Sequence, residues 1–232
     1  MEFKHDTYSS ELQDLAALRL LSGRENPTFL DIGCCAPIQN NNTYLLEKNG
    51  WEGVCVDIRG DFSEEFEKTR VTPFYEIDAK TKEFIKILKR HFPNKGIDYI
   101  SLDADQSTLE ILENLLYNDF NFNFMTFEHD YHYAVNEVSN GRRLGYGTRD
   151  EIELRKHKSK EILQKLGYHL LFEDVSFRDK HTGSVLHPWE DWWINPQQYS
   201  NTSYLRLDRM RSKNIHFKDC LDRIFEIVKI PE

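Results

Sequence analysis

The chain has little of several features that would assign it to other classes of protein. No apolar run approaches the ~20 residues needed to cross a bilayer, and the start, MEFKHDTYSSELQD, lacks the apolar segment of a signal peptide. Only four cysteines occur, and none has C-x-x-C spacing. We therefore expect reduced thiols in a cytoplasmic protein without a membrane span.

Positive charge is also scarce. The chain has 30 basic and 39 acidic residues, which gives 30 − 39 = −9. This is the wrong sign for gathering nucleic-acid phosphates over a broad surface, so we expect no nucleic-acid partner. At 39% hydrophobic and 30% charged residues, the composition is globular.

No internal repeat or linker divides the 232 residues, so one domain is expected. Residues 1–27 would form an N-terminal helical segment, residues 28–175 a Rossmann-like core, and residues 176–232 a C-terminal hairpin and helix. Strand, helix and strand alternate along the core, which predicts an α/β fold with one doubly wound, mostly parallel sheet.

A phosphate-binding glycine loop is absent from the stretch that best resembles a nucleotide site. Residues 28–58 read TFLDIGCCAPIQNNNTYLLEKNGWEGVCVDI, a strand, loop, helix and strand in which Asp31 and Asp57 close the two strands. Only Gly33 remains of a G-x-G-x-x-G pattern, so a pyrophosphate would not be held. An acid that ends the second strand can accept hydrogen bonds from ribose hydroxyls. A ligand with a ribose and no phosphate fits better, and S-adenosylmethionine (SAM) is the common one.

The run DIG followed by NNTYLLEKNGWEGVCVDI resembles the first βαβ unit of FkbM-type SAM-dependent methyltransferases. The double cysteine Cys34-Cys35 and Pro37 depart from the glycine loop of that family. The resemblance implies a class I methyltransferase fold. It also implies cofactor contacts from residues at the strand ends and the helix start: Asp31, Gly33, Asn42, Thr43, Asp57, Ile58, Asp78, Ala79 and Asp103. A looser match before the first strand, within a predicted helix over residues 8–22, suggests Gln13 and Asp14 as further contacts.

Two later strands also end in acids. The strand at residues 96–102 is followed by Asp103 and Asp105, and the strand at residues 122–127 by Glu128 and His129. Carboxyl ends of neighbouring parallel strands meet at one rim, and both segments resemble the fourth and fifth strands of the FkbM-type pattern. We expect Asp103, Glu128 and His129 to be catalytic, either as a base or as ligands of Mg²⁺ or Mn²⁺. Asp105 either contacts the substrate or caps the next helix, and His129 either acts as a base or orients an acid.

Three tryptophans, Trp189, Trp192 and Trp193, occur within five residues and are not typical of a helix or an ordinary strand. An aromatic platform beside carboxylates suits a sugar ring, so we expect His187 and one or more of the tryptophans to line the acceptor side, with core packing as the alternative. The tyrosine-rich connection at residues 131–149 is long enough to be a lid or binding segment.

These observations together predict an O-methyltransferase that acts on a hydroxyl of a sugar or glycan end. Two alternatives stay open: transfer to another small molecule, and a non-catalytic Rossmann-like binding module. The closing helix, which carries Cys220, Leu221 and Ile224, packs on the domain or on a second copy, so a homodimer is also left open.

Overall fold

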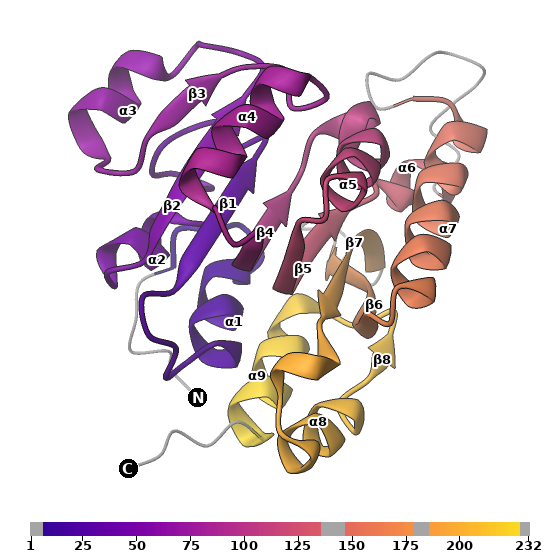
Figure 1. The fold of residues 1–232 in the computed structure, drawn as a ribbon. Coiled ribbons are helices and arrows are strands. Elements are labelled where there is room, and N and C mark those ends of the chain that lie inside the picture. The colour runs from indigo at the N-terminus through magenta and orange to yellow at the C-terminus, as the bar shows by residue number, and fades with distance from the viewer. Residues whose placement is uncertain (1–6, 136–146, 179–185, 228–232) are drawn as a thin grey trace.

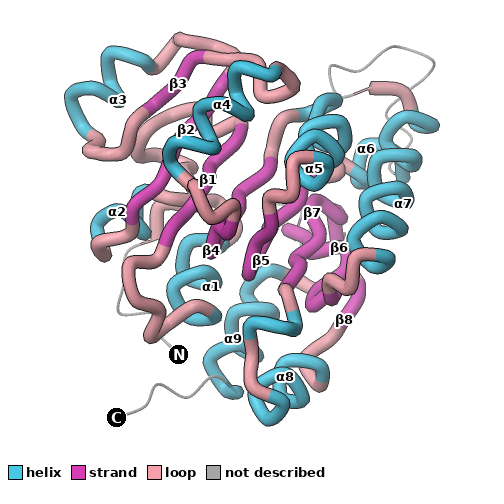
Figure 2. Tube along the Cα trace, viewed as in Figure 1, coloured by secondary structure: helices cyan, strands magenta, loops and turns pink. Residues whose placement is uncertain are grey.

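A computed structural model describes residues 7–135, 147–178 and 186–227. Its centre is an eight-stranded sheet in the order β3-β2-β1-β4-β5-β7-β6-β8. Figures 1 and 2 show helices packed on both faces of this sheet. The strands are β1 (Thr28–Ile32), β2 (Glu52–Asp57), β3 (Phe74–Glu76), β4 (Gly96–Leu102), β5 (Asn121–Glu128), β6 (His169–Arg178), β7 (Leu186–Ile194) and β8 (Ser212–Lys213). The doubly wound, mostly parallel sheet predicted from the sequence is confirmed.

The first five strands of the sheet are parallel and apolar on both faces. Alternate residues of β1 point to opposite sides, so Phe29 enters one core and Leu30 the other. The first core is covered by α1 (Gln13–Leu20), α2 (Tyr44–Lys48), α8 (Asn201–Asp208) and α9 (Phe217–Ile227). The second core is covered by α4 (Lys82–His91), α5 (Thr108–Tyr117) and α7 (Arg149–Lys165). Burial on both faces explains why these strands read as nearly continuous apolar runs.

The order of the strands reverses between β1 and β4. The chain proceeds outward from β1 through β2 and β3, and then returns to place β4 on the other side of β1. In an open α/β sheet, ligands bind in the crevice outside the carboxyl ends of the strands at such a point. The acids that follow β1, β2 and β4 therefore converge where a ligand is expected.

The parallel arrangement of the first five strands is interrupted by β7, and β8 pairs parallel with β6 at the far edge. β7 lies between β5 and β6 and pairs antiparallel with both. The tryptophan-rich segment thus forms the strand β7. The expectation that its composition is untypical of an ordinary strand was wrong. The tip of the β6–β7 hairpin, residues 179–185, and the centre of the predicted lid, residues 136–146, lie outside the described residues.

Two helix starts differ from the predicted ones. The N-terminal helix begins at Gln13 rather than near residue 8, after Leu12 adopts a left-handed conformation with φ 64°. α7 is capped by Thr148 rather than Asp150, through a reciprocal capping box with Glu151. Two shorter helices, α3 (Ser63–Thr69) and α6 (Tyr131–Val135), complete the set. Across the described part of the chain, no helix is long and apolar enough to cross a membrane.

Candidate functional site

Two cavities open at the carboxyl ends of the parallel strands. The larger has a volume of about 420 Å³ and the smaller about 280 Å³. Gly33, Cys35 and Asp103 line both cavities, so the two meet at these residues. The strand-order switch thus carries two neighbouring cavities that share these three lining residues.

Gly33 is required by packing at this junction. It has φ +79°, and a Cβ built on it would lie 1.5 Å from the backbone oxygen of Asp103. Only glycine combines this conformation with such a close approach. The absence of a side chain at Gly33 therefore lets the ends of β1 and β4 come together.

The smaller cavity collects several of the predicted cofactor residues. Ile58, Asp78, Ala79 and Asp105 line it together with Asp57. The carboxylate of Asp57 accepts the backbone N–H of Cys35 at 3.0 Å and of Arg59 at 2.9 Å. These bonds fix the carboxylate at the end of β2, and each oxygen keeps a lone pair for a further donor. Asp105 lies in this compartment and not in the larger one, where a substrate contact was expected.

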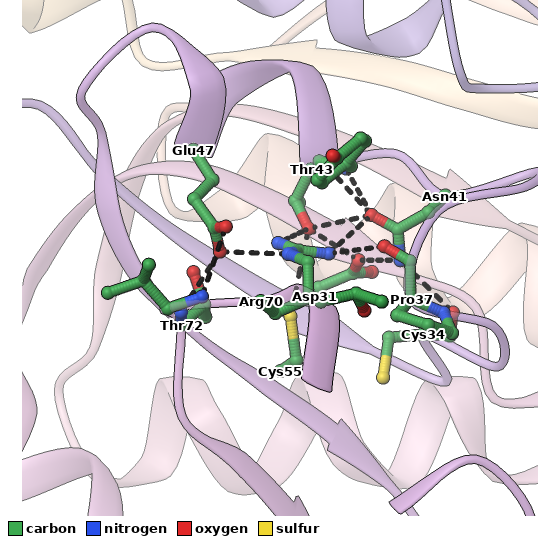
Figure 3. A network of polar contacts seen from close by, with 12 residues as sticks. Asp31, Cys34, Pro37, Asn41, Thr43, Glu47, Cys55, Arg70 and Thr72 are labelled. Carbon is green, nitrogen blue, oxygen red and sulfur yellow. Dashed lines mark hydrogen bonds and ion pairs between the residues drawn. The ribbon is translucent and has the colours of Figure 1, made fainter. Parts of the chain in front are cut away.

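Asp31 belongs to a buried polar network beside the larger cavity (Figure 3). Its carboxylate accepts Thr43 Oγ1 at 2.8 Å and Asn41 Nδ2 at 3.3 Å. Arg70 donates to the side chain of Asn41 at 3.1 Å and to that of Glu47 at 2.8 Å. Burial raises the pKa of Asp31, and the bond from Thr43 and the charge of Arg70 counteract that rise.

Asn42 and Thr43, which were both predicted to contact the cofactor, have different surroundings. Asn42 lines the larger cavity and donates to Ser101 Oγ at 3.0 Å. Thr43 is fully buried and lines neither cavity. The prediction that Thr43 contacts the cofactor directly is wrong, because its hydroxyl is occupied in holding Asp31.

Asp103 and Glu128 meet at the larger cavity, as their strand-end positions predicted. Each carboxyl group affects the pKa of the other. Burial raises the pKa of Asp103 to about 7 and, together with the charge of Asp103, raises the pKa of Glu128 well above its usual value. Burial and the neighbouring carboxyl group thus favour the protonated form of both side chains, and the titration of one depends on that of the other.

Glu190 is a further carboxyl group of this cavity, and the sequence reasoning missed it. It lies directly opposite Glu128 in the β5–β7 ladder and is 3% exposed. It accepts Trp192 Nε1 at 2.6 Å and Gln13 Nε2 at 3.1 Å. Burial raises the pKa of Glu190 to about 8. Gln13 therefore lies in the site, whereas Asp14 instead binds Tyr8 N at 2.8 Å and Ser9 Oγ at 2.8 Å.

His129 does not join Asp103 and Glu128. Its Nε2 lies 3.5 Å from Asp191 Oδ1 and 3.6 Å from Asp174 Oδ1, and its Nδ1 accepts the backbone N–H of Tyr131 at 3.1 Å. Among the described residues, the one group of three side chains near enough to share a metal is His129, Asp174 and Asp191. The predicted ligand set of Asp103, Glu128 and His129 is therefore wrong, and His129 is not a base at the rim. Lys156 already bonds Asp174 within the same cluster.

The tryptophans separate according to the alternation of β7. Trp192 and Trp193 are fully buried in the two opposite cores, so the prediction that they line the acceptor side is wrong. Trp189 is half-buried and lines the larger cavity with Phe177. His187 is not among the residues that line the two cavities. It stacks on Phe177, with ring centroids 4.9 Å apart.

The strand order, the helices on both faces and the position of the cleft define the Rossmann-like fold of the class I SAM-dependent methyltransferases. One solved structure with this fold is a provisionally assigned O-methyltransferase from Klebsiella pneumoniae, with a TM-score of 0.51 and 11% identity over 83% of each chain. The plantazolicin methyltransferase BamL, in complex with a triazolic desmethylPZN analog and SAH, gives 0.46 and 13% identity over 80% of this chain and 85% of its own. Human methyltransferase-like protein 13 in complex with SAH gives 0.41 and 12%, over 96% and 92%.

Comparisons of the sequence with known families and proteins do not assign the chain to a family. No protein-family model matches the chain, and no curated protein matches it. At 11% identity, the likeness to the Klebsiella pneumoniae structure shows the fold alone. The FkbM-type resemblance stays a prediction.

Proposed function

We propose that this protein is a SAM-dependent O-methyltransferase that transfers a methyl group to a hydroxyl of a sugar or glycan end. The observation that carries the proposal is the pair of neighbouring cavities at the strand ends, a smaller one of about 280 Å³ and a larger one lined by many polar side chains, which share Gly33, Cys35 and Asp103. A molecule that joins a nucleoside to an amino acid suits such a pair. The lack of a phosphate-binding glycine loop agrees with that choice.

In this proposal the smaller cavity holds the adenosine part of the cofactor. Asp57 accepts the ribose hydroxyls, and Asp78 and Ala79 lie against the adenine. The methionine part enters the larger cavity beside Asp31 and Asn42. The reactive methyl group then comes near Asp103, because that residue lies where the two compartments join.

The cofactor supplies an electrophilic methyl group, and the protein supplies alignment and a base. The acceptor oxygen bonds to the methyl carbon, the carbon–sulfur bond breaks with its electron pair on sulfur, and the hydroxyl proton passes to Asp103. A base with a pKa of about 7 suits this role, since it is partly ionised at neutral pH and still accepts a proton effectively. Glu128 lies beside Asp103 in the same cavity, and burial and the charge of Asp103 raise its pKa.

The acceptor is proposed to lie in the rest of the larger cavity. Trp189 and Phe177 offer an aromatic wall there, and Ser10, Asn40 and Thr126 offer polar atoms. Sugar rings combine an apolar face with hydroxyls at the edge, and this pairing of surfaces matches them.

Calorimetry with SAH tests the cofactor part of the proposal. Asp57→Asn should weaken SAH binding ~10-fold to ~150-fold, because a hydrogen bond to a charged group contributes about 1.5–3 kcal/mol. Asp61→Asn, a nearby exposed acid, is the matched control and should bind as the parent does. Failure of the unmodified protein to bind SAM or SAH would overturn the function, and unchanged affinity in a folded Asp57→Asn variant would remove Asp57 from the site.

A further inference from the structure

The loop after β1 is held in place without the repeated glycines that nucleotide-binding loops contain. Gly33 and Cys34 donate their backbone N–H groups to Val56 O, at 2.8 and 3.3 Å. Cys35 donates its own to Asp57 Oδ2 at 3.0 Å. These bonds fix the first part of the loop on β2, and the later part is anchored differently.

The anchor of the later part is a pair of buried side chains, Asn41 and Arg70 (Figure 3). Asn41 Nδ2 donates to the backbone oxygens of Cys34 and Ala36, at 3.2 and 3.0 Å. Arg70 Nη1 donates to Pro37 O at 2.8 Å and to Asn41 Oδ1 at 3.1 Å. Two side chains thus hold three carbonyl groups of the loop.

Arg70 comes from a later part of the chain, where it ends α3, and it is itself fixed. Its side chain is fully buried, and Glu47 in α2 accepts its Nε at 2.8 Å and supplies the balancing charge. Nη2 lies 3.4 Å from Thr43 Oγ1, and the same hydroxyl donates to Asp31 at 2.8 Å. A planar guanidinium has five N–H donors in a fixed fork, so it can hold this set of acceptors at once, which a lysine ammonium cannot.

Arg70 and Asn41 are not among the residues that line the two cavities, whereas the residues they hold are. The segment from the end of β1 to the start of α2 supplies six residues to the larger cavity: Asp31, Gly33, Cys34, Cys35, Asn40 and Asn42. Any effect of Arg70 on a ligand must therefore act through this segment.

We propose that Arg70 is a positioning residue for the cofactor: it holds Asp31 and the loop of residues 34–41 in the shape that receives the amino-acid part of SAM. This inference rests on the proposed function and adds a residue to it. A glycine-rich loop depends on the freedom of its backbone to approach a ligand. Here side-chain contacts order the loop in advance, so less conformational entropy is lost on binding.

The competing role for Arg70 is general support of the fold. Its ion pair with Glu47 joins the end of α3 to α2, and Glu47 also accepts the backbone N–H of Thr72 at 2.9 Å. The two roles affect different parts of the ligand. In the proposed arrangement adenosine lies in the smaller cavity, which receives only Gly33 and Cys35 from this segment, and β2 holds both. Positioning thus affects the amino-acid part, and general support affects both parts.

Calorimetry with two ligands separates these roles. SAH contains both parts, and 5′-methylthioadenosine contains the adenosine without the amino acid. Arg70→Lys keeps a positive charge beside Glu47 and loses the fork that reaches the loop. We expect SAH to bind ~10-fold or more weakly to this variant and 5′-methylthioadenosine to change by under ~2-fold. Arg90→Lys, at an exposed arginine of α4, is the matched control and should bind both ligands as the parent does.

A second variant leaves the ion pair intact. Asn41→Asp keeps an oxygen for Arg70 and for the backbone N–H of Tyr44, and it replaces the Nδ2 donor to Cys34 O and Ala36 O. It should weaken SAH binding selectively as well, whereas general support through the ion pair predicts parental binding.

Unchanged SAH affinity in folded Arg70→Lys, or an equal loss for both ligands, would overturn the inference. Either result would leave the methyltransferase proposal standing, because SAH binding by the parent is measured first. A parent that binds no SAH would remove both.

Discussion

Two acid-rich regions lie on either side of β5 and β7 and treat their charge in opposite ways. In one region, Asp130, Asp174 and Asp191 are buried together with Arg155, Lys156 and His129. In the other, Asp103, Glu128 and Glu190 surround the larger cavity without a basic side chain among its described lining residues. The alternation of β7 separates them, since Glu190 faces the cavity and its neighbour Asp191 faces His129.

The difference shows in the pKa values. Burial works to raise the pKa of Asp191, but His129 and the backbone N–H of Asp174 hold it below its usual range. Burial raises the pKa of Glu190 to about 8, and the bonds from Trp192 and Gln13 only moderate that rise. Equal burial thus gives an ionised carboxylate where cations are built in and a protonated one where they are not. The first region therefore balances its buried carboxylates with cations of the chain, whereas the second has no basic side chain among its described lining residues.

The largest expected effect comes from the unpaired region. Asp103→Asn should lower kcat/KM by ~10²-fold to ~10⁴-fold, because it removes the proposed base. The free energy of unfolding should change little, since no cation is left without its partner. Methyl transfer followed by mass spectrometry, and denaturant unfolding, measure the two quantities.

The pH profile of the unmodified enzyme provides the matching control. With Asp103 as base, kcat/KM should rise as the pH increases through about 7, and this limb should vanish in the Asp103→Asn variant. A limb of the same position in both proteins would assign the base elsewhere.

In the region where buried carboxylates are paired with cations, a substitution should instead lower the free energy of unfolding. Lys156→Met removes the cation beside Asp174 and should lower the free energy of unfolding by about 3–5 kcal/mol, the usual cost of breaking a buried pair. Lys158→Met, in an exposed pair with Glu161, should cost under ~1 kcal/mol. Urea unfolding of both variants checks the contrast, and a small loss in Lys156→Met would mean that the buried network contributes little to stability.

The Glu190→Gln variant tests the comparison through the pH dependence of the free energy of unfolding. The folded protein holds a proton on Glu190 up to a pH of about 8, whereas the unfolded chain releases it near 4.5, so this group lowers stability as the pH rises between those values. The variant should therefore match the parent at about pH 4 and exceed it by more than ~1 kcal/mol at about pH 9. Thermal unfolding across the pH range measures the difference, and parallel curves would contradict it.

The smallest expected effect is that of metal removal. Asp103 and Glu128 line the larger cavity, whereas His129 is buried beside Asp174 and Asp191, so the predicted rim set does not assemble three metal ligands. Exhaustive treatment with EDTA should leave turnover within ~2-fold of the untreated enzyme. A loss that Mg²⁺ or Mn²⁺ restores would reinstate metal-assisted transfer.

The parallel half of the molecule could be predicted closely from the sequence. Acids that follow apolar runs lie at strand ends, and parallel strands bring their carboxyl ends to one edge, so Asp31, Asp57, Asp103 and Glu128 were placed correctly at the cleft. These inferences need only local patterns and one topological rule.

The antiparallel half could not be predicted in this way. Glu190 reaches the cavity because β7 inserts between β5 and β6, a pairing between residues far apart in the chain. His129 follows Glu128 directly in the chain, yet its side chain lies beside Asp191 and not at the larger cavity. Neighbouring residues face opposite sides here, and the composition of the segment does not indicate which side each one takes. Trp192 and Trp193 were misplaced for the same reason, as alternation sends them into opposite cores.

The division of the cleft between two parts of the chain has a consequence for protein engineering. β1 to β4 and their loops supply the compartment proposed for adenosine, whereas β7 supplies Trp189 and Glu190 to the other. Substitutions at Trp189 or Glu190 would therefore change the lining of the larger cavity and leave that of the smaller one unaltered.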